Sequence, residues 1–396
     1  MQDEIRANEV RIDEERQNHR KVIGHWKGIL GEQTLPNGDV LSAIPHFDEK
    51  SGNDIWFVVA QMLENQMWAN PRQNSMEATV GTDISLPTLY SFPVIRQIFP
   101  ENFLNKICLI KPLPANSSGI GQVFYWKYYR TDDGSEITTS DGYSDWANMA
   151  TETTVPRQIN AKMTTENITA VRRMLAAVYS QTAAEDLMGA MQMDIEKENY
   201  NYMAEEMLRE LEQTGILGIY DGATAGTETW SSAIPTGVTA ENHYQTLYHS
   251  IIDAERLVTQ TYYKRCNYLV GGLGFVDYLR KSNHFTSRPD SKDPAKGITS
   301  GVQFEGRLDG HWDIYSTPLM STNTAFTSFY PLSMTRGGAV YAPYIPMTKM
   351  QKTYAGAETR GDGGALINND QWTLNVRTRD AFKLLLPDMF SKITIS

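Results

Sequence analysis

The side chains that most often catalyse reactions or bind metals are present in this chain of 396 residues, but their spacing matches no known motif. Its seven histidines include no i, i+4 pair, the spacing that places two imidazoles on one helix face for a metal. No Gly-x-Ser-x-Gly sequence presents a serine nucleophile. Neither Cys108 nor Cys266 stands beside a histidine. We therefore predict no metal, no cofactor and no catalytic residue.

A glycine-rich sequence at residues 271–274 follows a predicted strand and precedes a predicted helix, where a phosphate-binding loop would lie. It lacks the Lys-Ser/Thr pair that completes a P-loop, and its glycines do not have the spacing of a dinucleotide-binding fingerprint. A tight turn between a strand and a helix explains these glycines without any ligand.

Residues 131–156 carry six acidic side chains and no lysine or arginine. Two carboxylates could serve a glycosidase as acid and base, but that chemistry needs a cleft that raises one pKa, and a polar loop gives no desolvation. Polar loops of this length are uncommon within a compact domain and often have a function. We interpret it as a loop that contacts a partner, and the predicted contact residues are Asp132, Asp133, Glu136, Asp141, Asp145, Trp146 and Glu152.

Composition favours a folded protein of more than one lobe. The hydrophobic fraction of 41% and the charged fraction of 21% argue against disorder, and 396 residues exceed what one core usually serves. No apolar run is long enough for a membrane span, and the charged N-terminus does not resemble a secretory signal, so we expect synthesis in the cytoplasm. The net charge of -11 disfavours tight DNA binding.

Hydrophobic patterns and turn residues divide the first half of the chain. Residues 1–88 contain a charged helix and a helix at 55–67 that Asn70-Pro71 should end. The apolar run 107–110 and the aromatic run 123–130 predict two strands of a hairpin. Strands should return near 155–163 and 171–179. A capping box at Thr182 then opens one long helix over 182–213, which Gly215 should terminate.

The sequence of the second half of the chain predicts a lobe that mixes helices and strands. Helices are expected at 241–263 and 275–280, and strands at 267–270, 312–315, 340–354 and 372–377. Both cysteines lie in apolar strand-like runs, where a free thiol acts as a small buried side chain more often than as half of a disulfide.

This order of parts resembles the Hong Kong 97-type major capsid protein of tailed bacteriophages, and most closely the T-even-type major head proteins. The residues that carry the resemblance are Phe92-Pro93-Val94-Ile95-Arg96 with Ile98 and Pro100, then 107–113 and 121–124, and later Val340-Tyr341-Ala342-Pro343-Tyr344-Ile345-Pro346. Each of these motifs consists of residues that pack in the core and is not a catalytic motif, so each alone is weak evidence for the family. Their order along the chain is the stronger evidence. The resemblance implies an α+β fold and a structural, non-enzymatic subunit of an icosahedral or prolate virion capsid.

The resemblance also implies a division of the chain. Residues 1–88 would be an N-terminal arm and 131–160 an extended loop across a neighbouring subunit. A peripheral domain with a spine helix would contain 89–130, 161–214 and 340–380, and an axial domain would contain 215–339 and 381–396. Subunits would form hexamers and pentamers, with separate scaffold, portal and possible decoration proteins, around double-stranded DNA that is enclosed without tight or specific binding.

One departure concerns covalent cross-linking. In the family's namesake, a loop lysine forms an isopeptide bond with an asparagine of another subunit, but residues 131–156 contain no lysine. Lys127 and Lys162, at the base of the loop, are the alternatives. We therefore expect a shell held by noncovalent contacts.

Two other functions remain open from the sequence. An encapsulin-like cellular compartment shares the fold, although that family normally lacks so long an N-terminal arm. A cytosolic carbohydrate hydrolase would use aromatic residues as sugar platforms and two carboxylates as acid and base. Electron microscopy separates assembly from hydrolysis, because only the assembling protein forms shells or capsomers.

Overall fold

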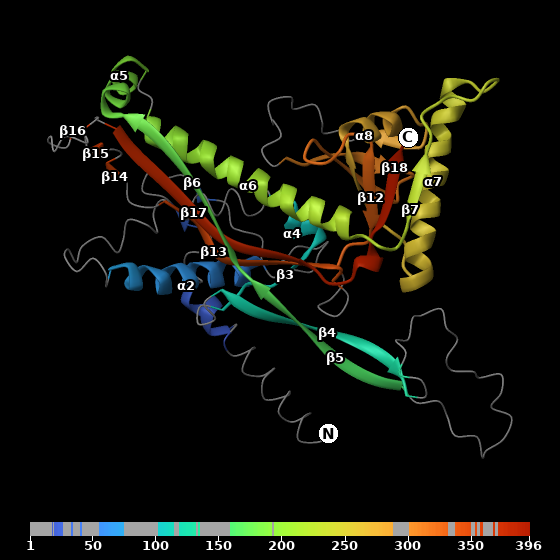
Figure 1. Cartoon of the computed structure of the whole chain (residues 1–396), viewed down its shortest axis with the longest axis horizontal. Coiled ribbons are helices and arrows are strands. Elements are labelled where there is room, and N and C mark those ends of the chain that lie inside the picture. Colours follow the sequence, from blue (N-terminus) through green and yellow to red (C-terminus); the bar gives the residue numbers. More distant parts are fainter. Residues whose placement is uncertain are drawn as a thin grey trace.

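Two β-sheets organise the computed structural model of this protein, and a long helix lies on the smaller sheet and ends beside the larger one (Figure 1). The structure describes residues 18, 20–26, 33–34, 40–41, 55–74, 102–114, 119–131, 134, 159–191, 194–287, 301–331, 337–349, 353–354, 357–358, 367–368 and 371–396. Helices and strands are mixed along the chain, and strands pair both in parallel and antiparallel. The predicted α+β class is confirmed.

The larger sheet has seven strands in the order β7-β18-β12-β8-β11-β10-β9. They are β7 (Thr227–Trp230), β8 (Tyr268–Gly272), β9 (Phe285–Ser287), β10 (Gln303–Leu308), β11 (Trp312–Thr317), β12 (Thr324–Ser328) and β18 (Ser391–Ile395). Every residue of β8 and β11 is buried, as expected of central strands covered on both faces. Strand β18 lies between β7 and β12, so the last residues complete this sheet.

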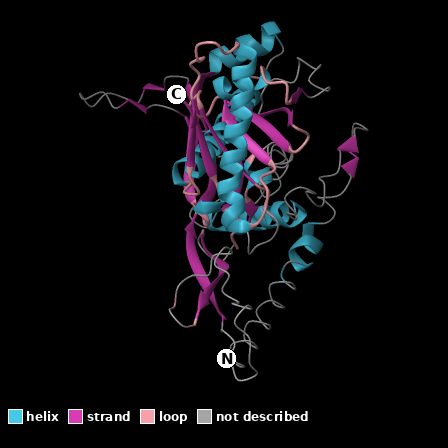
Figure 2. Cartoon of the chain, turned by 90° about the vertical axis from the view of Figure 1, so that its right-hand side faces the viewer, coloured by secondary structure: helices cyan, strands magenta, loops and turns pink. Residues whose placement is uncertain are grey.

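Two helices pack on the larger sheet, α7 (Ala240–Tyr262) and α8 (Leu273–Arg280). Helix α7, at the right of Figure 1, runs lengthwise over the face that Figure 2 turns to the viewer. Leu247, Ile251, Ala254 and Val258 recur every three or four residues and are fully buried, so one face of α7 meets the core. The helices and strands predicted between 241 and 280 are confirmed.

The smaller sheet has β14 (Thr353–Tyr354), β17 (Gln371–Leu384), β13 (Ala339–Lys349) and β3 (Leu109–Ile110) in that order, and β6 (Val171–Ser180) pairs with the other edge of β17. Helix α6 (Ile195–Gly222) lies across this sheet. Its Met203 and Met207 pack with Leu374 and Val376 of β17. The strand predicted at 372–377 is therefore correct in place and extends farther.

The predicted hairpin between 107–110 and 123–130 is wrong. Strand β3 pairs in parallel with β13, more than 200 residues away, while β4 (Ile120–Arg130) pairs antiparallel with β5 (Ile159–Thr169). Prolines at 112 and 114 separate the first two strands and disfavour a tight turn between them. The β4–β5 hairpin extends away from both sheets (Figure 1).

The single long helix predicted at 182–213 is two helices, α5 (Gln181–Met191) and α6. Asp194 begins the second helix, because its carboxylate accepts hydrogen bonds from the backbone N–H groups of Glu196 and Lys197. Helix α6 also continues past Gly215 to Gly222. A Cβ at position 215 would lie 2.5 Å from the buried Leu104, so this glycine permits close packing and does not end the helix.

Near the N-terminus, residues 18 and 20–26 are helical, β1 (Gln33–Thr34) pairs with β2 (Val40–Leu41), and α2 (Ile55–Asn74) continues through the proline at 71. The expected stop at Asn70-Pro71 is wrong, because an interior proline removes one backbone donor without always ending a helix. Val58, Val59 and Leu63 of α2 join the main core. Among the described helices, none is long and apolar enough to cross a membrane.

The main core is continuous between the two sheets. Helix α4 (Leu104–Ile107) and Cys108 share it with β8, the end of α6 and the 3-10 helix η4 (Pro387–Met389). Cys108 and Cys266 are both buried and free, as predicted. Two short strands, β15 (Ala357–Glu358) and β16 (Ile367–Asn368), form a separate pair.

Paired glycine substitutions test whether α6 depends on close packing at Gly215. Gly215→Ala should lower the free energy of unfolding by about 1–3 kcal/mol, because its Cβ would overlap the buried Leu104. Gly189→Ala in α5, where a Cβ meets nothing within 4 Å, should instead raise it by about 0.5–1 kcal/mol. Urea unfolding of the subunit measures both. Equal effects would contradict a packing role for Gly215.

Candidate functional site

The seven predicted contact residues, from Asp132 to Glu152, all lie outside the described residues. The structure does describe the two strands that precede and follow this loop: β4 ends at Arg130, and β5 begins at Ile159. Eleven cross-strand pairs, from Ile120 opposite Thr169 to Arg130 opposite Ile159, hold the two strands in unbroken register. The loop is therefore carried at the end of a regular two-stranded ribbon.

The base of this ribbon is fixed to the smaller sheet. Val123, Ile168 and Ala170 are buried in a cluster with residues of β3, β13 and β17. Lys111 donates a hydrogen bond of 3.2 Å to the carbonyl oxygen of Gln122. Burial at the base and pairing along the ribbon give the loop a defined starting direction.

A glycine permits the entry into the ribbon. Gly119 has φ of +83°, in the region that favours glycine, and its carbonyl oxygen accepts a hydrogen bond of 2.7 Å from the Ala170 N–H. A Cβ here would lie 2.7 Å from the guanidinium of Arg379, so a larger residue would disturb both the turn and β17.

The two lysines discussed as cross-linking alternatives, Lys127 and Lys162, are directly opposite each other in the register of β4 and β5. Lys162 is exposed, and its Nζ lies 6.0 Å from the ring centroid of Tyr129.

A second surface lies on β6, which follows β5 directly. Alternate residues of β6 face α6, and the intervening residues Arg172, Met174, Ala176 and Val178 are exposed on the opposite, outer face. The exposed fractions of Met174 and Val178 are 50% and 57%. The sequence predicted a strand here but not its exposed face, because both alternating sets contain apolar residues.

Arginines of two strands share this outer face. Arg172 is opposite Arg379 of β17, and Arg377 is opposite Met174, so all three side chains start from one side of the sheet. The pKa of Arg377 is lowered, first by burial and then by the positive charges of Arg172 and Arg379. The outer face is therefore locally positive in a chain whose net charge is -11.

Arg173, the neighbour of Arg172, points the other way into a buried ion pair. Its Nε lies 3.2 Å from Oδ1 of Asp380, and its Nη1 lies 3.2 Å from Oε1 of Glu210 on α6. Burial raises the pKa of Asp380, and the charge of Arg173 opposes that rise. This pair links β6, β17 and α6, and no sequence pattern connects residues 207 positions apart.

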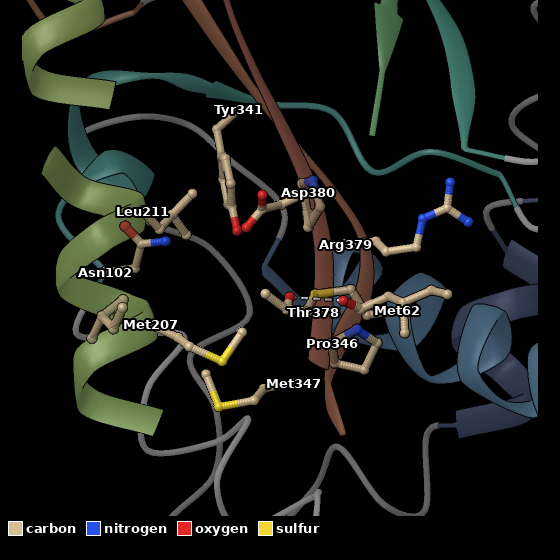
Figure 3. Close-up of a pocket in the computed structure, with 13 residues that line it drawn as sticks. Met62, Asn102, Met207, Leu211, Tyr341, Pro346, Met347, Thr378, Arg379 and Asp380 are labelled. Atoms are coloured by element: carbon tan, nitrogen blue, oxygen red, sulfur yellow. Dashed lines mark hydrogen bonds between the residues drawn. The ribbon is translucent and has the colours of Figure 1, made fainter. Parts of the chain in front are cut away.

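A mainly apolar pocket lies between α2, α6, β13 and β17 (Figure 3). Its lining residues are Met62, Asn102, Met207, Leu208, Leu211, Tyr341, Pro343, Ile345, Pro346, Met347, Thr378, Arg379 and Asp380. Asp380 is the one carboxylate in this lining, and it is paired with Arg173. The pocket therefore does not supply the two carboxylates that a glycosidase needs.

The glycine-rich sequence forms a tight turn, as predicted. Strand β8 ends at Gly272 and α8 begins at Leu273, with the backbone of Ser321 and Thr322 directly against Gly272. The N–H of Phe275 donates to the Thr322 carbonyl oxygen at 2.8 Å, which uses a helix donor that a phosphate would need.

The histidines of the larger lobe take part in packing. His243 stacks on Trp230 with ring centroids 4.9 Å apart, and its Nε2 lies 2.9 Å from the Ser231 carbonyl oxygen. His284 stacks on Tyr248 at 4.3 Å. Within the described part of the chain, no three His, Cys, Asp or Glu side chains are grouped as metal ligands would be.

Comparison with known proteins connects these features to one family. The family model "Major capsid protein Gp23" matches residues 129–360, which is more than half of the chain. A search of curated proteins gives no match.

Solved structures from two phages and from a GTA particle resemble the chain remotely. A Microbacterium phage Oxtober96 chain is 12% identical, with a TM-score of 0.44 over 82% of this chain and 99% of that one. A chain from the capsid of Myoviridae phage XM1 is 10% identical, with a TM-score of 0.46 over 74% and 92%. A chain from the capsid of an empty GTA particle is 14% identical, with a TM-score of 0.44 over 83% and 99%.

Removal of Arg173 tests the buried ion pair that fixes β6 to β17. Arg173→Met should lower the free energy of unfolding by about 3 kcal/mol at neutral pH, because Asp380 would keep a buried charge without its partner. Without Arg173 the folded-state pKa of Asp380 rises further above its unfolded value, so the loss should shrink as pH falls towards about 4.

Asp380→Asn in the same chain is the control, because it removes the unpaired charge. Urea unfolding of Arg173→Met with and without Asp380→Asn, at neutral and acidic pH, measures the rescue. A pH-independent loss that Asp380→Asn leaves unchanged would show that Arg173 contributes by packing alone.

Proposed function

Because the Gp23 model matches residues 129–360, the chain belongs to the Gp23 family of major capsid proteins, and we propose that its subunits form hexamers and pentamers that enclose double-stranded DNA. The protein is a structural subunit of a viral capsid. The observation that carries the proposal is this family match, which extends from the end of β4 to just after β15.

The two sheets support the expected division into domains. The smaller sheet with α6 would form the peripheral domain, and the larger sheet with α7 and α8 would form the axial domain around each capsomer axis. Helix α6, 28 residues long, spans about 42 Å at 1.5 Å per residue. It ends beside the larger sheet, so it suits the role of a spine that holds a fixed spacing.

The hairpin supports a role as an intersubunit arm. Its base packs in the subunit's own cluster through Val123 and Ile168, while the ribbon extends away from both sheets (Figure 1). A ribbon of two strands alone is marginally stable in water, so a neighbouring surface would stabilise its far part. We infer that residues 131–160, with the seven predicted contact residues, lie across a neighbouring subunit.

Charge supports the proposed relation to DNA. A chain with net charge -11 offers little general attraction for phosphate, which suits a wall that surrounds DNA and later releases it. We propose synthesis in the host cytoplasm, followed by assembly with separate scaffold and portal proteins and possible decoration proteins. No catalytic role is part of this proposal.

Electron microscopy of the purified protein tests assembly. We expect capsomers or closed shells above a threshold concentration, because many small contacts repeated by symmetry stabilise a shell cooperatively. A monomer at every concentration, alone or with the scaffold, would contradict the proposed assembly. Hydrolysis of oligosaccharides by that monomer would instead favour the hydrolase alternative.

A denaturing gel tests noncovalent assembly. Shell protein boiled with detergent and reductant should migrate as the 44.7 kDa monomer, because residues 131–156 carry no lysine for an isopeptide bond. A double variant, Lys127→Arg with Lys162→Arg, provides the control. A ladder of oligomers in the natural protein, lost in this variant, would show that the prediction is wrong and that these lysines form the links.

A further inference from the structure

Helix α7 buries one carboxylate against the core. Of the three acidic residues in this fully described helix, Glu241, Asp253 and Glu255, only Glu255 is buried, with 7% of its surface exposed. The fully buried Ile251 and Val258 lie about one turn before and after it. Its Oε1 makes no hydrogen bond within the described residues. A carboxylate in such a place is costly to ionise unless a positive charge lies close to it.

The side chain of His311 lies beside this carboxylate. Its Nε2 is 3.6 Å from Oε1 of Glu255, a distance that suits an ion pair but is too long for a hydrogen bond. The imidazole is 40% exposed, so it can exchange a proton with water. His311 belongs to the turn between β10 and β11, in which Asp309 and Gly310 have positive φ. One ionisable pair therefore joins this turn to α7.

A second contact joins α7 to the same turn. The hydroxyl of Tyr248, about two helical turns before Glu255, donates a hydrogen bond of 2.9 Å to Oδ2 of Asp309. The ring of His284 stacks on Tyr248, with centroids 4.3 Å apart. Burial and then the Asp309 carboxylate raise the pKa of Tyr248, so its hydroxyl keeps its proton at neutral pH. In the range where an imidazole titrates, pH therefore acts on the Glu255–His311 pair.

The surroundings of Glu255 decide the direction in which pH acts. Burial raises the pKa of Glu255, and the charges of His311 and Arg265 oppose this rise. A raised folded-state pKa means that stability is full below the ordinary value of 4.5 and is lost as pH rises through the folded-state value. The other ionisable groups at this contact are Tyr248 of α7, Arg265 and Cys266 of the chain that follows it, Asp309 of the turn, and His284 against Tyr248.

The C-terminal end of α7 is the part that this contact secures. The helix ends at Tyr262, and Tyr263 follows with φ of +51°, a conformation that costs a non-glycine residue free energy. The chain returns to the core at the fully buried Cys266, whose backbone N–H hydrogen-bonds Glu255, and enters β8 at Tyr268. A change at Glu255 would therefore act first on this short connection.

We propose that Glu255 and His311 form a proton-dependent latch, which ties the end of α7 to the β10–β11 turn while the imidazole carries a proton and loosens when it does not. At acidic pH the carboxyl is neutral or paired, and neither state leaves an unpaired charge in the core. As pH rises, His311 releases its proton to water and Glu255 keeps a buried negative charge. The latch lies within one subunit, so it goes beyond the assembly proposed above and does not depend on it.

Thiol labelling measures the opening of the latch. Cys266 lies beside Glu255, whereas Cys108 is buried next to β3, so local opening exposes only the first thiol and global unfolding exposes both. The ratio of their reaction rates with iodoacetamide, read from peptide masses, cancels the effect of pH on thiol chemistry. In the natural protein we expect the ratio of Cys266 to Cys108 to rise about tenfold between about pH 5 and about pH 8, as one unit of pKa shift implies.

Two substitutions assign the effect to the pair. His311→Gln removes the positive charge, so it should raise the labelling ratio severalfold at about pH 6 and change it little at about pH 8. Glu255→Gln removes the buried charge, so the ratio should stay low and independent of pH, with or without His311→Gln. His249→Gln, at an exposed histidine of α7, is the matched control and should keep the natural profile.

The natural protein alone can overturn the latch, even if a variant does not fold. A labelling ratio that stays constant across this pH range would do so. Among variants that circular dichroism shows to be folded, a His311→Gln profile equal to the natural one would also overturn it. A rise with pH that persists in Glu255→Gln would show that another group is responsible and would overturn the role of this carboxylate.

Discussion

The close contact of α6 with β17 and α4 is the constraint on which the two-sheet arrangement depends. Gly215, Gly218 and Gly222 face Leu104, Phe382 and Leu384, and a Cβ at any of them would lie too close to these side chains. The glycines let the last turns of α6 approach the place where β17 leaves the smaller sheet. Because α6 then leads into β7, this contact also sets the position of the larger sheet.

Local patterns predicted the elements that local interactions determine. The apolar stripe of α7 and the direct passage from β8 to α8 follow from spacing and glycine, and the structure has both. Pairings distant in sequence could not be predicted this way. Leu109 and Ile110 pair with Val340 and Tyr341, and no pattern near residue 109 distinguishes that partner from the nearby aromatic strand. Gly215 was misleading because a helix-ending glycine and a packing glycine look alike in sequence.

For the candidate site, too, the sequence predicted some features and only the fold shows the others. The acidic composition of residues 131–156 is visible in the sequence, and it indicated an interaction without its location. The positive outer face of β6 could not be predicted, because Arg172 and Arg173 are adjacent in sequence and only the fold places them on opposite faces. Arg173 lies in the buried pair with Asp380, whereas Arg172 is exposed beside Met174. The first holds the strand in place, and the second lies at the surface.

Stability of the subunit and stability of a shell place different demands on this chain. The buried pair and the continuous core make the two sheets rigid, so the positions of the hairpin and of β6 are fixed relative to each other. A contact between exposed charges is individually weak and sensitive to salt. Repetition by symmetry makes many such contacts strong together, while each can still form and break during assembly. Noncovalent contacts of this kind let misplaced subunits leave before the shell closes, which an early covalent link would prevent.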